Sequence, residues 1–253
     1  MSNKSNCLGC LATVALLACA VTAAPQQKAS TVNGHLAYSH VERLVGFGPR
    51  PPGSQAIAKS QAYITEVLKN LNLQVEHQDF LANTPNGPVS MKNIVGKTRQ
   101  AGTPVVILGS HYDTRVMTNT AFVGANDGGS STGLLLELAR VLSQRRNAFT
   151  VWFVFFDGEE AQRDWSETDS LYGSRYFVER LKAEGQTRAV KAMILMDMVG
   201  DRELKLENDT TSTPWLMERV RRSAVELGYE KYLAAAQKGM VDDHVPFIRA
   251  GIA

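Results

Sequence analysis

The sequence predicts an α/β protein, a three-layer sandwich around a mixed, mostly parallel β-sheet. Continuous apolar runs at 104–108, 150–156 and 192–196 have the length and composition of strands that are buried on both faces. Amphipathic segments with helical spacing separate these runs, at 130–145 and 171–184. Alternation of buried strands with helices is typical of a parallel sheet that carries helices on its faces.

Two helices are expected before this alternation begins. Apolar residues at helical spacing predict a short helix over 35–47, which ends at the rigid turn Gly48–Gly53. Ser54 is a suitable N-cap for a second helix, whose apolar face runs from Ile57 to Leu71.

A hairpin and a late helix complete the predicted elements. The extended segments 73–80 and 89–95 flank a Pro-Asn-Gly-Pro turn, which predicts an antiparallel hairpin at one edge of the sheet. Near the other end of the chain, Thr213 and Pro214 supply a cap and a first-turn proline for a further helix.

The first residues predict an export signal. Lys4 precedes an apolar run over 11–23 that is shorter than a membrane span, with a cleavage site expected after Ala23. We expect a signal peptide over 1–23, a linker over 24–33, a catalytic domain over 34–253 and an exported protein, periplasmic or secreted, without a membrane span. A retained anchor is the alternative, and a loose lipobox would place a lipid anchor on Cys19.

Charge and cysteine content exclude several functions. Lys and Arg number 27 against 25 Asp and Glu, a net charge of +2 that does not predict a nucleic-acid-binding surface. All three cysteines, Cys7, Cys10 and Cys19, lie within the expected signal peptide. The mature chain therefore has neither disulfide nor thiolate chemistry, and a metal site in it must use His, Asp and Glu.

Acidic residues follow the predicted strands where active sites of open α/β sheets lie. The first strand leads into His111–Asp113, the second into Asp157–Glu160 and the third into Asp197, while Asp127 precedes the helix at 130–145. Clustered carboxylates repel one another, and a bound cation relieves that repulsion. Oxygen and imidazole donors favour zinc, so the sequence predicts a zinc site at this edge.

The adjacent pair Glu159 and Glu160 predicts two different roles. Neighbouring residues that leave a strand point in different directions, so one carboxylate can bind metal while the other acts as a general base. A solvated loop is the alternative for a Glu-Glu pair alone, and the preceding Phe-Phe-Asp-Gly favours the site. His111 and Asp113 share a face of an extended chain, so Asp113 is expected to orient the imidazole.

Several motifs resemble the zinc aminopeptidase clan of peptidase family M28. They are Gly109–Thr114, Val123–Asp127, Phe156–Glu160 and Leu195–Gly200. The segment 161–175, which contains Trp165, and the segment Asp242–Phe247 more specifically resemble the animal-type glutaminyl-peptide cyclotransferases, or glutaminyl cyclases. The resemblance runs from about Phe47 to the last residue and implies the zinc aminopeptidase-like fold.

The resemblance assigns roles to individual residues. It implies that Asp127 and Glu160 are zinc ligands and that Glu159 transfers protons. It implies that Asp197 and Asp242 belong to the catalytic hydrogen-bond network.

The resemblance also implies that Trp165 forms an aromatic wall of the substrate pocket, whereas an ordinary core tryptophan is the alternative.

The family's third zinc ligand is a histidine in a Trp-His-Thr segment that follows one further strand. This sequence stops at Arg249–Ala253, and His244 does not occupy the ligand position. We therefore expect the last strand, a closing helix and that ligand to be missing.

The implied activity is cyclisation of N-terminal glutamine to pyroglutamate with release of ammonia. Its expected partners are peptides or proteins with N-terminal glutamine, and its expected cofactor is one zinc ion. One alternative is an M28 aminopeptidase with two zinc ions, in which Asp127 bridges the metals, His111 and Asp197 are added ligands and Glu159 activates water. The other is a non-catalytic exported binding domain.

Overall fold

The computed structural model describes residues 31–99, 104–117 and 119–253. The expected signal peptide, the lipid anchor on Cys19 and most of the expected linker lie outside these residues. In the described part of the chain, no helix is both long and apolar enough to cross a membrane.

The N-terminal elements form as the sequence predicts. Helix α1 spans Gly34–Val45, and helix α2 spans Gln55–Asn70. The Ser54 hydroxyl oxygen accepts a hydrogen bond from the Ile57 N–H at 3.1 Å, which confirms the predicted cap. Strands β1 (Gln74–Thr84) and β2 (Gly87–Lys97) pair antiparallel through a tight turn, and both are longer than the segments expected from sequence.

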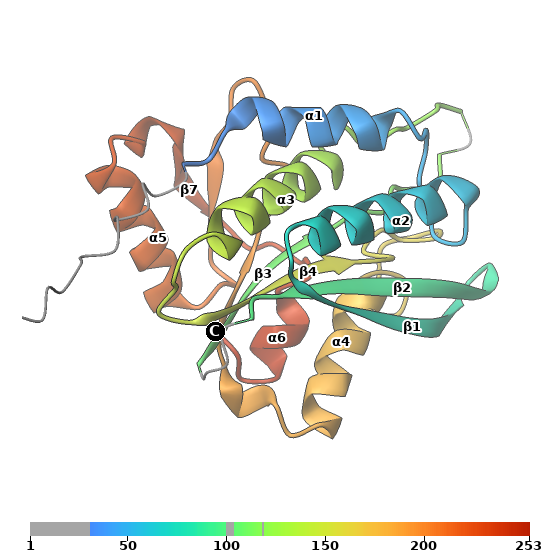
Figure 1. Ribbon diagram of the computed structural model, residues 1–253. Coiled ribbons are helices and arrows are strands. Elements are labelled where there is room, and N and C mark those ends of the chain that lie inside the picture. Colours follow the sequence, from blue (N-terminus) through green and yellow to red (C-terminus); the bar gives the residue numbers. More distant parts are fainter. Residues whose placement is uncertain (1–30, 100–103, 118) are drawn as a thin grey trace, which may run out of the picture.

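The remaining elements complete a sandwich of helices and sheet. They are β3 (Val105–His111), α3 (Gly129–Ser143), β4 (Thr150–Phe156), α4 (Tyr172–Ala183), β5 (Val190–Leu195), β6 (Leu206–Asp209), α5 (Pro214–Glu226), β7 (Leu233–Lys238) and α6 (Val245–Arg249). Helices α1, α2 and α3 lie over one face of the sheet, and α4 and α6 lie over the other (Figure 1).

The main sheet is mixed and mostly parallel, as predicted. Its strand order is β1-β2-β4-β3-β5. Strands β3, β4 and β5 are parallel, whereas β2 runs antiparallel to both of its neighbours. The carboxyl ends of β3, β4 and β5 therefore meet at one edge of the sheet, where their following loops come together.

Strand β4 shows how the sheet separates two apolar cores. Phe153 and Phe155 face α2 and α3, while Val154 and Phe156 face α4 and α6. All four side chains are fully buried, as expected for a central strand that is covered on both faces. This continuous burial explains why an uninterrupted apolar run predicted the strand correctly.

Three elements lack a signal in the sequence. Strands β6 and β7 form a separate two-stranded parallel sheet, and their residues are half-buried or exposed. Neither strand has the apolar alternation that predicts a half-buried strand. Helix α6 has five residues, too few for a helical repeat to be visible.

Candidate active site and metal centre

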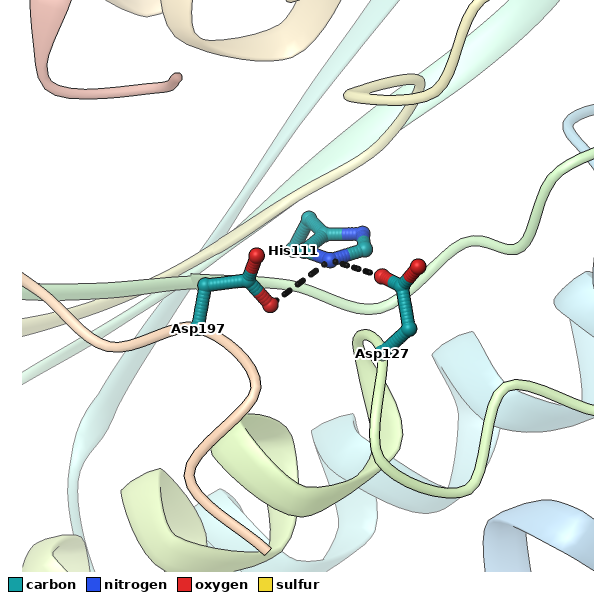
Figure 2. A group of neighbouring side chains, drawn as sticks. All are labelled: His111, Asp127 and Asp197. Carbon is teal, nitrogen blue, oxygen red and sulfur yellow. Dashed lines mark hydrogen bonds and ion pairs between the residues drawn. The ribbon is translucent and has the colours of Figure 1, made fainter. Parts of the chain in front are cut away.

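His111 lies at the centre of the carboxyl edge of the sheet. It is the last residue of β3, and its side chain is 1% exposed. Its Nε2 atom lies 3.1 Å from Asp127 Oδ1 and 3.2 Å from Asp197 Oδ1 (Figure 2). One ligand atom from each of these residues lies within 4.8 Å of the others, so together they can hold a metal ion.

This cluster favours positive charge. Burial disfavours the imidazolium form of His111, but the surrounding carboxylates, Glu159 foremost, raise the pKa of His111 well above its ordinary value. The same carboxylates that stabilise a protonated imidazole would stabilise a divalent cation at this place. The electrostatics of the site therefore fit a metal.

Gly128 lets the loop that carries Asp127 approach His111. Its φ of +69° lies in the left-handed region. A Cβ atom there would lie 2.8 Å from the Asp113 carbonyl oxygen and 2.9 Å from His111 Cε1. Any side chain at this position would push the Asp127 loop away from the imidazole.

Asp113 connects the end of β3 to the glutamate pair. Its side chain is fully buried, and Oδ1 lies 3.4 Å from His111 Nδ1. Oδ1 accepts the Glu159 N–H at 3.1 Å, and Oδ2 accepts the Glu160 N–H at 3.2 Å. The contact with His111 was expected from the sequence. The binding of two backbone amides was not expected, because every residue type offers a backbone N–H and the sequence does not indicate which one is used.

Glu159 and Glu160 are both buried, at 6% and 7% exposed, and each has acidic neighbours that raise its pKa. Burial, followed by the negative charges of Asp242 and Asp243, raises the pKa of Glu159 well above its ordinary value, while His111 opposes the shift. For Glu160, burial and the charge of Asp127 raise the pKa to about 7. The division of roles between the two glutamates stays a prediction.

Asp197 and Asp242 complete the acidic edge from the other side. Burial alone would raise the pKa of Asp197, but its hydrogen bond with His111 lowers the pKa below the ordinary value. Burial and the charge of Asp197 raise the pKa of Asp242 to about 7. A third acid, Asp243, is fully buried, and burial and the charge of Asp242 raise its pKa well above the ordinary value. Sequence reasoning did not select Asp243.

Trp165 lies on the surface beside this edge. Its side chain is 42% exposed, and it lines a cavity of about 230 Å³ together with Leu171 and Val241. Asp197 and Asp242 line a second cavity of about 480 Å³. The segment Val241-Asp242 therefore borders both hollows. The role of Trp165 in substrate binding stays a prediction.

The donor set fits zinc. Asp127 and Asp197 offer carboxylate oxygens within 4.8 Å of an imidazole nitrogen, whereas Glu160 is not part of this group, although the charge of Asp127 raises its pKa. His111 offers an imidazole nitrogen beside Asp127. Carboxylate oxygen and imidazole nitrogen are typical zinc donors, so the group formed by His111, Asp127 and Asp197 fits zinc.

The fold and the site together define an α/β protein of the zinc exopeptidase type. The chain belongs to peptidase family M28, whose family model matches residues 93–253. A glutaminyl-peptide cyclotransferase from Drosophila melanogaster is 27% identical over 230 residues, which cover 81% of this chain and 65% of that protein. The chain spans only 61–66% of the length of this protein and of three further curated relatives, which are mammalian.

Solved structures show the same relationship. A glutaminyl cyclase from an Acidobacteriales bacterium is 36% identical, with a TM-score of 0.85 over 91% of this chain and 80% of that one. A Zn-dependent exopeptidase from Parabacteroides distasonis is 27% identical, with a TM-score of 0.82 over 89% of this chain and 83% of that one. The expected family and fold are therefore confirmed.

Proposed function

We propose that this protein catalyses the zinc-dependent cyclisation of N-terminal glutamine in peptides or proteins, with release of ammonia. The observation that carries the proposal is the placement of Glu159, whose side chain is buried and whose Oε2 lies 3.9 Å from His111 Nδ1 at the carboxyl edge of the sheet. The similarity to glutaminyl cyclases supports the choice of substrate.

In this proposal, Asp127 and Glu160 hold the zinc ion. When bound, zinc would supply Lewis-acid polarisation of the side-chain amide carbonyl of the substrate. The two carboxylates lie on different segments, one before α3 and one after β4, and Asp113 fixes the second through the Glu160 N–H at 3.2 Å.

Glu159 is the proton carrier in the proposed reaction. The α-amine nitrogen of the substrate attacks the side-chain amide carbon while Glu159 accepts a proton from that nitrogen. The bond between carbon and the amide nitrogen then breaks as Glu159 returns the proton to the leaving group. A five-membered lactam and ammonia result, and nothing is oxidised or reduced.

The other acids and Trp165 position the substrate. Asp197 and Asp242 are within reach of charge interactions with Glu159 and His111 and would orient the reacting nitrogens. Trp165 would contact the substrate from the smaller of the two cavities, where its ring is exposed. Export of the protein, with removal of residues 1–23, remains part of the proposal.

A second candidate is an aminopeptidase with two metal ions. The specific observation in its favour is the group His111, Asp127 and Asp197, whose ligand atoms lie within 4.8 Å of one another. Asp127 would then bridge two ions, and Glu159 would activate a water molecule. The Zn-dependent exopeptidase among the structural neighbours also supports this candidate.

Zinc content and product analysis separate the two candidates. The full-length protein should bind one zinc ion per chain and release ammonia from peptides with N-terminal glutamine, with the lactam detected by mass spectrometry. His111→Asn should keep that one zinc ion. Two zinc ions in the parent, one in His111→Asn, and cleavage of chromogenic aminoacyl substrates without ammonia release would establish the aminopeptidase instead.

A further inference from the structure

Arg50 is a buried cation behind the site. Its side chain is 0% exposed, although it lies in the turn between α1 and α2. Nε donates to the Tyr112 carbonyl at 3.1 Å, Nη1 to the Val123 carbonyl at 2.7 Å and Nη2 to the Gly124 carbonyl at 3.1 Å. One guanidinium thus joins two segments that are separate in the sequence.

The backbone of Arg50 strengthens the same connection. Its N–H donates to Thr114 Oγ1 at 2.8 Å, and its carbonyl accepts the Thr114 N–H at 3.2 Å. Packing around the guanidinium is tight, because a Cβ atom on Gly124 would lie 3.3 Å from Arg50 Nη2 and 2.6 Å from Thr114 Cγ2. The turn, the end of β3 and the loop before α3 therefore form one packed unit.

The segments that Arg50 joins carry the site. Tyr112 lies between His111 and Asp113, and Gly124 lies shortly before Asp127. Burial lowers the pKa of Arg50 to about 10, and the negative charges of Asp113 and Asp127 oppose that shift in part. The guanidinium of Arg50 donates to the backbone carbonyls of these segments, so Arg50 acts on the site through other residues.

We propose that Arg50 is a positioning residue for the metal site: its planar guanidinium fixes the Asp127 loop against the His111–Asp113 segment. This inference rests on the part of the proposed function in which Asp127 binds a metal ion. The fixed positive charge also offsets part of the negative charge of the acidic edge. A lysine in this place would keep the charge but not the three-way geometry of the donors.

The test compares Arg50→Lys with Arg140→Lys in the full-length protein. Arg140 is a suitable control because its guanidinium also makes more than one hydrogen bond: Nε and Nη2 each donate to the Glu137 carboxylate at 2.7 Å, on α3. Zinc affinity is measured by chelator competition well below the unfolding temperature of each protein. Thermal unfolding of the metal-free proteins and the absorption spectrum with Co²⁺ are recorded in parallel.

Arg50→Lys should weaken zinc binding about 10–100-fold, the usual effect of losing an outer contact of a metal site, and should alter the Co²⁺ spectrum. Arg140→Lys should lower thermal stability and leave both metal readouts unchanged. If Arg50→Lys loses stability but keeps the zinc affinity and the Co²⁺ spectrum of the parent, Arg50 is a structural support only and the proposal is wrong.

Thr114→Val is a milder second variant that decides the question if Arg50→Lys does not fold. It removes the side-chain acceptor of the Arg50 N–H and keeps the guanidinium. Zinc binding should weaken several-fold, and unchanged zinc binding would overturn the proposal. The metal readouts do not depend on the substrate, so a failure to release ammonia would count against the proposed function and not against the role of Arg50.

Discussion

Two regions of the molecule meet at the site and are built in opposite ways. The inner region, residues 104–195, contains β3, β4 and β5 of the main sheet, and its helix α3 buries most of its first ten residues. The outer region, residues 198–241, contains β6, α5 and β7, and α5 has no buried residue. Asp197 and Asp242 flank the outer region at its two ends.

The difference shows how the two halves of the site are held. His111, Asp127, Glu159 and Glu160 come from the inner region, where Asp113 contacts His111 and accepts the Glu159 and Glu160 N–H groups. Asp197 and Asp242 stand where the chain leaves and re-enters the packed structure. The inner region supplies the metal ligands and the proton carrier of the proposed reaction. The end of the outer region leads into Asp242, a supporting acid.

The largest expected effect separates the proton carrier from that supporting acid. Glu159→Gln should lower kcat by about 10²–10⁴-fold, the usual contribution of a general acid–base group, and should retain zinc. Asp242→Asn should lower kcat less, because it contributes through the environment of Glu159. Steady-state kinetics with zinc analysis checks both variants. Equal zinc loss in Glu159→Gln and Glu160→Gln would show that the two roles are divided wrongly.

A stability comparison tests the packing of the two regions directly. Phe155→Ala in the inner region should lower the free energy of unfolding by about 3–5 kcal/mol, because its ring is fully buried against α2 and α3. Trp215→Ala in the outer region removes a side chain that is 50% exposed and should cost within about 0.5 kcal/mol. Urea unfolding measures both free energies. Similar losses of stability in the two variants would contradict the difference in packing between the inner and outer regions.

Asp209 is the main polar tie within the outer region. Its carboxylate accepts the N–H groups of Thr211 and Met240, each at 3.0 Å, and lies 3.2 Å from His244 Nε2. Asp209→Ala should lower the free energy of unfolding by about 1–3 kcal/mol, since the half-buried Met240 N–H and Ser212 hydroxyl lose their acceptor. It should also lower kcat, because Met240 adjoins the Val241-Asp242 segment.

The control for Asp209→Ala is Glu207→Ala, which changes an exposed acid on the same strand. Burial would raise the pKa of Asp209, but its hydrogen bonds lower the pKa below the ordinary value. Its contribution to stability is therefore present at neutral pH and is lost as the pH falls through the lowered pKa. If Asp209→Ala lowers the free energy of unfolding by the same amount at all pH values, the contribution of Asp209 to stability is not electrostatic.

The smallest expected effect concerns Trp165, which belongs to the inner region by sequence but is exposed like the outer region. Trp165→Ala should raise KM about tenfold, equivalent to ~1.4 kcal/mol of binding, with little change in thermal stability. Kinetics with a glutaminyl peptide and thermal unfolding give the two readings. A large fall in stability at unchanged KM would place the ring in the core instead.

The difference in burial between the inner and outer regions also explains which elements the sequence could predict. Apolar runs such as Thr150–Phe156 predicted the inner strands because burial on both faces demands apolar residues at every position. Strand β6, with the sequence Leu-Glu-Asn-Asp, is held by backbone pairing with β7, and no side-chain pattern records that pairing. Helix α5 was nevertheless expected, because Pro214 marks its first turn.

For the site, the acids at the strand ends could be found because each follows a buried run. The role of Asp113 in holding the Glu159 and Glu160 amides could not, since its partners are backbone N–H groups. The buried Asp243 and the connection made by Arg50 are equally invisible, because they depend on which loops the fold brings together.

The contact between Gly128 and His111 has a consequence for the thermodynamics of ligand binding. The imidazole lies against a glycine backbone on one side and between carboxylates on the other, so its rotamer freedom is lost when the chain folds. A metal ion or substrate that arrives later meets a ring that is already oriented and does not bear that entropy cost. The absence of a side chain at position 128 thus makes the site preorganised.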